Sequence, residues 1–202
     1  MTPQGGEPIP PYPVGTVGLL LAGGLSRRYG SPKAFALYEG RPFHERAHAA
    51  LSGACDQVIV SASAALAPQF PDACEVCVDL PELAGLGPLA GLASVMRRYP
   101  AERYIALPCD MPRVGPREIR RLRSATQNGP SADVKAVRSA EAGDLPLLSV
   151  WRGGLADRLE ESVRGGQLGV MKLLAGLDTV WLDAALLHPD PAIFHNFNVP
   201  QL

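Results

Sequence analysis

The segment LLLAGGLSRRYGSPKA, residues 19–34, places two glycines and three positive charges directly after an apolar run. Gly23 and Gly24 would let the backbone approach a ligand closely and point its N–H groups at an anion. Arg28 and Lys33 could hold phosphate oxygens, and an arginine can do so through two parallel hydrogen bonds. Neither GxxxxGK[ST] nor GxGxxG is present in the segment. The residue types therefore indicate either an unconventional phosphate-binding loop or a solvated basic turn.

Two aspartates also follow apolar runs. Asp110 lies between two prolines in LPCDMP, residues 107–112, so its carboxylate should be held stiffly. One or two carboxylates together with substrate oxygens are the ligands that Mg²⁺ prefers, although an aspartate here could equally serve a turn or a helix cap. Asp79 presents the same alternatives. Gly87 and Gly91, which follow it, indicate a close approach of the backbone before a helix.

Apolar runs alternate with helix-like stretches along the whole chain. This alternation predicts βαβ units and an α/β fold with a mostly parallel sheet. Ligands of such sheets bind beyond the carboxyl ends of the strands, and the glycine-rich loop, Asp79 and Asp110 all follow strands, which favours function over the plain turns. We expect strands at 17–22, 57–63, 74–79, 103–108, 133–138, 147–151 and 179–183, helices at 44–53, 88–99, 115–125, 153–164 and 169–177, and a flexible loop at 139–145.

The composition indicates one ordinary folded domain. The chain has 202 residues, of which 47% are hydrophobic, and a formal net charge of -1. The apolar content excludes a disordered chain, and the balanced charge argues against a general nucleic-acid binder. No apolar stretch is long enough to span a membrane. We expect residues 1–14 to form a flexible, proline-rich lead-in and residues 15–202 to form a single domain.

Two further pairs of residues could bind a metal. Cys74 and Cys77 form a CxxC pair, but their spacing on a predicted strand places the side chains on opposite faces. His44 and His48 are four residues apart on a predicted helix, without a clear third ligand beside them. We interpret both pairs as structural or surface residues. Because the N-terminus also lacks the features of a secretory signal, we predict a cytoplasmic protein with reduced thiols.

Taken together and in order, four motifs resemble those of the molybdenum cofactor guanylyltransferases. They are LAGGLSRRYGSPK (21–33), VDLPELAGLGPLAGL (78–92), LPCDMP (107–112) and FHNFNVP (194–200). The first and third resemble motifs shared by nucleotidyltransferases of the sugar-nucleotide type, whereas the other two are more particular to this family. The resemblance implies a Rossmann-like nucleotidyltransferase sandwich, with a mostly parallel, mixed central sheet and helices on both faces.

The resemblance also implies an activity: transfer of GMP from Mg-GTP to molybdopterin, with release of pyrophosphate. LAGG in place of LAAG favours guanine over cytosine. By match, the catalytic residues are Arg28, Lys33 and Asp110, and Asp110 binds Mg²⁺. The implied nucleotide contacts are Leu21, Ala22, Gly23, Gly24, Lys33, Ser61, Asp79 and Asp110, where Ser61 replaces an asparagine of the family and keeps that contact only in part. The implied molybdopterin side consists of Gly87, Gly91, Asn196 and Asn198.

The chain departs from the family pattern at two places. Pro32 stands where the family often has an aspartate, and residues 167–169 stand where it can carry an arginine that helps to hold the acceptor. Arg164 and Lys172 are the candidates to replace that arginine. The alternatives are a related nucleotidyltransferase that uses CTP or a sugar-phosphate acceptor, and an inactive nucleotide-binding assembly protein. Cofactor-insertion proteins or molybdoenzymes are the implied protein partners, with no nucleic acid and no membrane.

Overall fold

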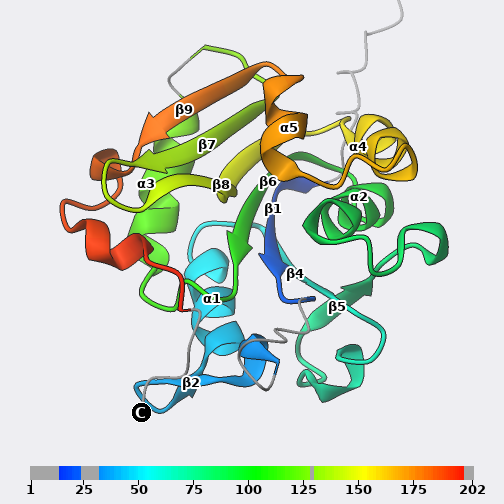
Figure 1. Cartoon of the computed structure of the whole chain (residues 1–202). Coiled ribbons are helices and arrows are strands. Elements are labelled where there is room, and N and C mark those ends of the chain that lie inside the picture. Colours follow the sequence, from blue (N-terminus) through cyan, green and yellow to red (C-terminus); the bar gives the residue numbers. More distant parts are fainter. Residues whose placement is uncertain (1–13, 24–31, 128–129, 198–202) are drawn as a thin grey trace, which may run out of the picture.

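A seven-stranded sheet forms the centre of the molecule, in the strand order β5-β4-β1-β6-β8-β7-β9 (Figure 1). The computed structural model describes residues 14–23, 32–127 and 130–197. Strands β5, β4, β1 and β6 are parallel, β8 runs antiparallel to both of its neighbours, and β9 is parallel to β7. The predicted mixed, mostly parallel sheet is therefore confirmed. The strands are β1 Val14–Leu21, β4 Gln57–Ala62, β5 Glu75–Val78, β6 Ala101–Pro108, β7 Val134–Ser139, β8 Gly143–Arg152 and β9 Thr179–Asp183.

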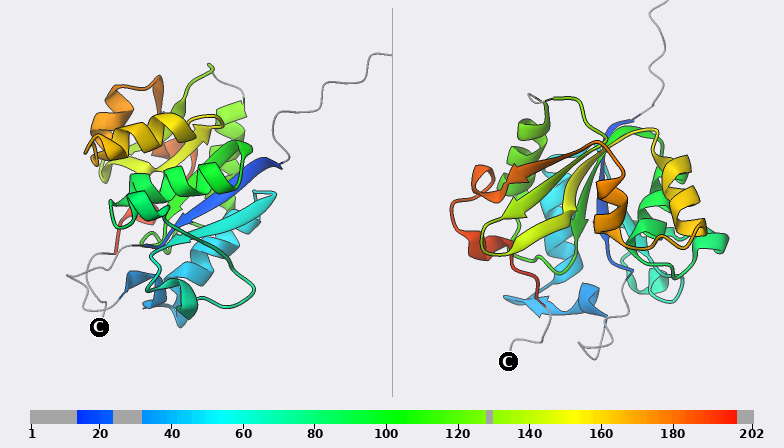
Figure 2. Two further views of the ribbon diagram at one scale, coloured as in Figure 1. Left: turned by 90° about the vertical axis from the view of Figure 1, so that its right-hand side faces the viewer. Right: turned by 45° about the horizontal axis from the view of Figure 1, so that its top comes forward.

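Helices cover both faces of the sheet (Figure 2). Helices α1 and α3 pack on one face, and α2, α4 and α5 pack on the other, so that two apolar clusters enclose the strands. The helices are α1 Phe43–Ser52, α2 Pro88–Arg98, α3 Pro116–Gln127, α4 Ala156–Arg164 and α5 Val170–Ala175. Short elements complete the described chain: the hairpin β2 Leu37–Tyr38 and β3 Arg41–Pro42, and the 3-10 turns η1 Lys33–Phe35, η2 Ala67–Gln69, η3 Pro81–Leu83, η4 Ala184–Leu186 and η5 Pro191–Phe194.

Strand β1 shows why an uninterrupted apolar run predicts a central strand. Leu19 belongs to the cluster under α2, and the next residue, Leu20, belongs to the cluster under α1. Both are completely buried. Because successive side chains of a strand point to opposite faces, a strand covered on both faces needs apolar residues at every position.

The CxxC pair is split by the sheet, as predicted. Cys74 packs against the cluster under α1 and α3, and Cys77 is buried in the opposite cluster. Both thiols are free. Nor do the described residues contain a group of three or more His, Cys, Asp or Glu side chains placed to hold a metal ion. Among the same residues, no helix combines the length and apolar character needed to cross a membrane.

The prediction of a flexible loop at 139–145 is wrong. Strand β7 extends to Ser139 and β8 begins at Gly143, and these two residues are paired across a tight hairpin. The Ser139 hydroxyl accepts hydrogen bonds from the N–H groups of Glu141 and Ala142, which fixes the turn. Gly143 has a φ of 76°, a conformation that glycine adopts without strain. The polar composition of this segment does not indicate that one strand ends and the next begins within it.

Candidate active site

The loops that follow β1, β4 and β6 lie side by side at the carboxyl edge of the sheet. The Ala22 N–H donates to the Ser61 carbonyl at 2.9 Å, and the Cys109 N–H donates to the Leu21 carbonyl at 3.1 Å. These bonds continue the strand pairing just beyond the strand ends. Ala22 is buried, and Gly23, the next residue, is exposed. The chain therefore leaves the core at the glycine, as the sequence predicts.

Lys33 and Asp110 meet at this edge. Lys33 opens η1 and Asp110 follows β6, and the Lys33 Nζ donates to the Asp110 Oδ2 at 2.9 Å. The two side chains retain 15% and 20% of their exposure, so the pair is reachable from solvent. An ammonium and a carboxylate in this arrangement can be separated by a ligand that brings both a cation and phosphate oxygens. Two residues predicted from separate motifs are thus brought together.

The neighbouring Cys109 takes no such part. It is buried, and this burial, with the nearby Asp110 carboxylate adding to it, raises the pKa of the thiol to about 12. A thiol with that pKa stays protonated at neutral pH and is not a nucleophile.

His44 supports the turn that carries Lys33. Its Nδ1 lies 2.8 Å from the Ala34 carbonyl, which can only accept, so Nδ1 bears the proton. The ring packs against Phe35 and Phe70, with both centroid distances at 5.1 Å. The interpretation of His44 as a packing residue is confirmed, but no sequence signal pointed to its bond with Ala34.

Asp79, Ser61 and Gly91 form a second group at the same edge. A Cβ atom at Gly91 would lie 2.3 Å from the Ser61 Oγ and 3.8 Å from the Asp79 Oδ1, so only glycine lets α2 approach this closely. Gly87, with a φ of 87°, precedes the first residue of α2. Gly91, predicted for the molybdopterin side, is thus grouped with two residues predicted for the nucleotide.

The carboxylate of this group is partly buried. The Asp79 Oδ2 accepts the Gly85 N–H at 3.2 Å. Burial raises the pKa of Asp79 above its usual value, and the Gly85 bond and the charge of Arg98 offset part of that rise. Asp79 is therefore a carboxylate whose negative charge is poorly compensated, so it would gain from hydrogen-bond donors on a ligand.

Arg164 is engaged with other carboxylates. Its Nη2 donates to the Glu82 Oε1 at 2.9 Å and to the Glu160 Oε2 at 3.1 Å, which ties α4 to η3 in the loop after Asp79. The other oxygen of Glu160 accepts from the Arg97 Nε at 2.6 Å. Lys172, the second candidate for the missing acceptor arginine, is exposed on α5.

The C-terminal motif lies against the Asp110 loop. The Phe197 N–H donates to the Asp110 carbonyl at 2.9 Å, and the Phe197 ring contacts Tyr38 and Phe43 at centroid distances of 5.1 and 6.0 Å. Asn196 is exposed directly before this anchor. Three predicted site residues, Gly24, Arg28 and Asn198, lie outside the described residues.

Ser63 is a candidate that sequence reasoning missed. A Cβ at Gly23 would lie 3.6 Å from the Ser63 backbone nitrogen, which places Ser63 beside the exposed glycine. The Ser63 hydroxyl is buried and has no hydrogen-bond partner within the described ranges. A buried polar atom without a partner is costly and marks a position where a ligand could bind. The sequence feature that could have indicated Ser63 is the second serine of VSAS, which lies two residues after Ser61.

Residues 18–180 match the family model of the MobA-like NTP transferase domain. The match extends from β1 into β9 and includes Lys33, Asp79 and Asp110. The chain belongs to the MobA-like NTP transferase family. The protein is thus a nucleotidyltransferase, and the carboxyl edge described above is the candidate active site of this MobA-like enzyme.

Similar proteins cover nearly the whole chain. A "Probable molybdenum cofactor guanylyltransferase" of Bacillus licheniformis is 32% identical over 182 residues, 89% of this chain and 90% of that protein. A protein of the same name from Bacillus velezensis is 31% identical over 184 residues, 90% of each. The crystal structure of molybdopterin-guanine dinucleotide biosynthesis protein A from Archaeoglobus fulgidus superposes with a TM-score of 0.74 at 23% identity, covering 91% of this chain and 93% of that one. The last comparison supports the fold of the MobA-like domain.

Proposed function

We propose that this MobA-like enzyme transfers GMP from Mg-GTP to the phosphate of molybdopterin and releases pyrophosphate. Relatives named molybdenum cofactor guanylyltransferases support the proposal over about 90% of the chain. The observation that carries it is the Lys33–Asp110 pair, because it brings a phosphate-binding cation and a metal-binding carboxylate to the carboxyl edge of a parallel sheet.

The residues at this edge fit a magnesium ion that arrives with a nucleotide. Asp110 offers an accessible carboxylate, and no cluster of three or more acidic, His or Cys ligands accompanies it in the described residues. Mg²⁺ is commonly held by one or two carboxylates together with phosphate oxygens and water. Bound there, the ion would supply neutralisation of charge on the triphosphate.

The chain's own residues would bind and orient the reacting groups. Lys33 would hold phosphate oxygens and stabilise the charge of the leaving pyrophosphate, and Asp110 would hold the ion. The N–H groups of the Gly23–Gly24 turn and the Arg28 guanidinium would contact the same phosphates. A phosphate oxygen of the acceptor attacks the α-phosphorus of GTP, and the bond to the pyrophosphate oxygen breaks. The acceptor phosphate is already ionised near neutral pH, so no general base is needed.

The group around Asp79 would hold the guanosine. A carboxylate accepts hydrogen bonds from nucleoside N–H and O–H donors, and the partly buried Asp79 would gain a compensating partner. Ser61, in the neighbouring strand β4, and Ser63, just after that strand, carry hydroxyl groups at the same edge. On the acceptor side, the exposed Asn196 and Lys172 are the proposed contacts, with Asn198 following in sequence, because Arg164 is already held by two carboxylates.

Turnover with a panel of nucleotides tests the proposal. The purified protein is supplied with Mg²⁺, molybdopterin and GTP, CTP, UTP or ATP in turn, and the pyrophosphate and the nucleotidylated pterin are both measured. We expect turnover with GTP to exceed turnover with each other nucleotide, and to stop in Asp110→Asn. A preference for CTP, or turnover with a sugar phosphate but not with molybdopterin, would replace the proposed substrates. Binding of GTP without any transfer would instead favour the inactive assembly protein.

A further inference from the structure

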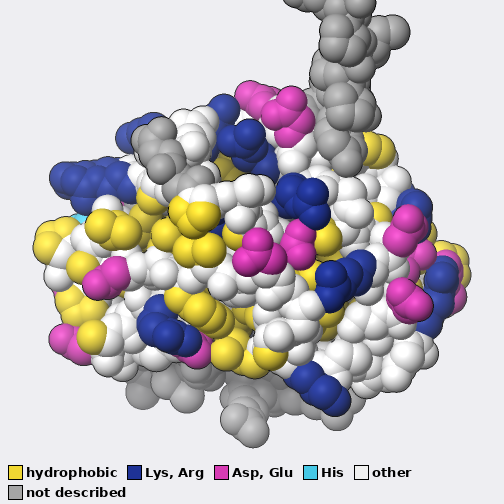
Figure 3. Space-filling view, turned by 90° about the horizontal axis from the view of Figure 1, so that it is seen from above, with side chains coloured by type: hydrophobic (Ala, Val, Ile, Leu, Met, Phe, Trp, Pro, Cys, Tyr) yellow, Lys and Arg dark blue, Asp and Glu magenta, His cyan; other side chains and the backbone are white. Residues whose placement is uncertain are grey.

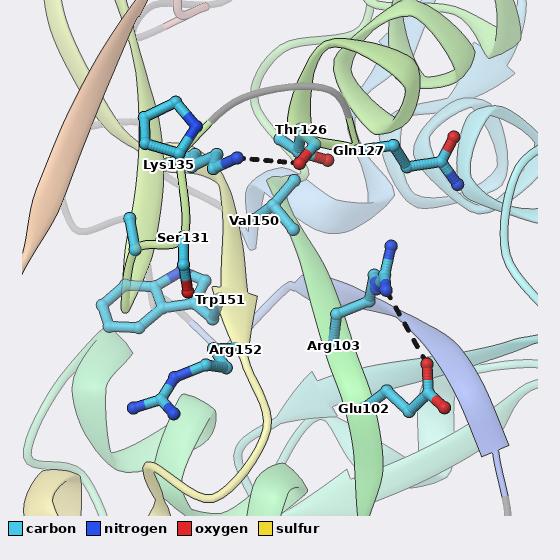
Figure 4. Close-up of a pocket in the computed structure, with 11 residues that line it drawn as sticks. Glu102, Arg103, Thr126, Gln127, Ser131, Lys135, Val150, Trp151 and Arg152 are labelled. Atoms are coloured by element: carbon cyan, nitrogen blue, oxygen red, sulfur yellow. Dashed lines mark hydrogen bonds and ion pairs between the residues drawn. The ribbon is translucent and has the colours of Figure 1, made fainter.

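A cavity of about 430 Å³ opens at the amino edge of the sheet, opposite the candidate active site. It lies between the C-terminal end of α3 and the neighbouring strands β6, β8 and β7 (Figure 4). Figure 3 looks onto this edge from above and shows several Lys and Arg side chains across its upper half. No residue implied by the family resemblance lines this cavity. Its volume falls in the range of sites that bind small metabolites.

Three cations on adjacent strands line this cavity. Arg103 of β6 is paired directly with Arg152 of β8, and Lys135 of β7 is paired with Val150, two residues before Arg152. Lys135 and Arg103 extend toward the C-terminal end of α3, whereas Arg152, the last residue of β8, points away from them (Figure 4). Arg103 and Lys135 are therefore the two cations that extend to the same side of the cavity.

Lys135 adds a second, independent observation. It is only 7% exposed, and its Nζ donates to the Thr126 carbonyl in the last turn of α3 at 2.7 Å. The carbonyls at a helix C-terminus attract a cation but carry only partial charge. Within the described ranges, no carboxylate forms an ion pair with Lys135. A buried ammonium has three N–H donors and is costly unless they are met by acceptors and charge.

The nearby carboxylates form ion pairs with the two arginines. Asp133 pairs with Arg152 at 2.7 Å, and Glu102 lies 3.7 Å from Arg103, a longer contact. Arg103 keeps a third of its side chain exposed and could turn its guanidinium into the cavity. The cavity therefore combines a buried ammonium that lacks a carboxylate with a guanidinium that is only loosely paired.

We propose that this cavity binds a small phosphate-bearing molecule, at a site separate from Lys33 and Asp110. A guanidinium and an ammonium together are suited to phosphate, since one contributes a planar pair of donors and the other a compact charge. The volume exceeds the needs of one inorganic phosphate, so we assign the ligand to the class of phosphate monoesters of small metabolites. The ligand enters at the opposite edge of the sheet from the nucleotide and does not compete with it.

Titration followed by amide NMR locates such binding without nucleotide or turnover. Uniformly ¹⁵N-labelled protein is titrated with ribose 5-phosphate and, separately, with inorganic phosphate, and sodium chloride matches the ionic strength. We expect saturable shifts at residues 102–103, 126–127, 131–135 and 150–152, with tighter binding of the monoester. If inorganic phosphate bound equally well, the assignment to a monoester would be overturned in favour of a free-phosphate site.

Variants separate this cavity from the active site. Lys135→Met and Arg103→Gln should each weaken binding by about tenfold or more, because a charge-assisted hydrogen bond is lost. Lys33→Ala, at the other edge, should leave the affinity unchanged, as should Arg117→Gln, an exposed arginine near the start of α3. If the buried Lys135→Met variant does not fold, Arg103→Gln decides alone. Shifts that do not saturate, that centre on Lys33 and Asp110, or that weaken equally in Arg117→Gln would overturn the proposal.

Discussion

Lys33 and Lys135 lie at opposite edges of one sheet and face different charges. Lys33 donates to the Asp110 carboxylate at 2.9 Å, whereas Lys135 is more deeply buried and donates to a helix carbonyl at 2.7 Å. An accessible ion pair is neutral at rest and can be opened by a ligand that brings its own cation and anion. A buried ammonium facing only partial charge can be neutralised by an anion alone. The comparison therefore favours a metal-bound nucleotide at one edge and a simple anion at the other.

Removing the carboxylate at Asp110 should have the largest effect. Asp110→Asn removes the charge that would hold the metal, so we expect turnover with GTP to fall by about a hundredfold or more. The fold should persist, because the side chain is partly exposed and lies in a loop. Steady-state kinetics beside thermal unfolding measure the two effects. Asp157→Asn, the same change at an exposed aspartate of α4, is the control. Equal rates in the two variants would remove Asp110 from the mechanism.

Neutralising Lys33 should have the next largest effect. Lys33→Ala loses a charge-assisted hydrogen bond to phosphate, so kcat/KM for GTP should fall by roughly ten- to a hundredfold. Arg28→Lys should also be impaired, since a point charge cannot reproduce the planar pair of donors. Arg27→Ala provides the control from the same sequence segment. If Lys33→Ala and Arg27→Ala both retained the wild-type kcat/KM, the loop would be a solvated basic turn.

Asp79→Asn should weaken nucleotide binding while stabilising the free protein. Burial raises the pKa of Asp79, so ionisation of this carboxyl disfavours the folded state. Below the pKa that Asp79 has in the unfolded chain, the carboxyl is protonated and the wild-type protein does not bear this cost. As the pH rises through the raised pKa of the folded state, Asp79 ionises and the wild-type protein loses that stability. The melting temperature of Asp79→Asn should therefore exceed that of wild type at pH 7, and the gap should close as the pH falls toward 4.

Calorimetry completes the Asp79 prediction. We expect the affinity for GTP to fall by about tenfold in Asp79→Asn, because an amide accepts fewer donors than a carboxylate. A variant that is more stable and still binds GTP with wild-type affinity would show that Asp79 has no part in holding the nucleoside.

Arg164→Gln should have the smallest effect. The change frees η3 from α4 but leaves Asp79 itself in place, so KM for GTP should rise about two- to fivefold at unchanged kcat. Arg158→Gln, on the same helix, is the control, since Arg158 donates instead to the Gly176 carbonyl. If kcat, measured with the acceptor as the varied substrate, fell while KM for GTP stayed unchanged, Arg164 would take the place of the acceptor-binding arginine that this chain lacks.

The residues at the carboxyl edge could be predicted because they follow strands that can be recognised from their own sequence, without knowledge of the rest of the fold. VGLLLA and RYIALP are apolar at nearly every position, so the positions of the glycine loop and of Asp110 at one edge follow from the parallel sheet. The contact between Lys33 and Asp110 is consistent with that prediction. The roles of the individual residues in binding and catalysis remain predictions, and the experiments above test them.

The amino edge could not be predicted, because its chemistry depends on register. Arg103 and Arg152 are neighbours only through the pairing of β6 with the antiparallel β8, and spacing along the chain contains no sign of that pairing. The bond of His44 to Ala34 likewise depends on how α1 packs against η1. At 139–145 the polar residues were a poor guide, because an exposed hairpin and a flexible loop share the same composition.

The dependence of GTP affinity on magnesium tests the central claim most directly. Calorimetric titration of GTP, with and without Mg²⁺, is performed on wild type and on Asp110→Asn. If Asp110 binds the metal ion that accompanies the nucleotide, Mg²⁺ should strengthen GTP binding strongly in wild type and hardly at all in the variant. An equal gain from Mg²⁺ in both proteins would contradict the assignment of the Lys33–Asp110 pair as the site of Mg-GTP.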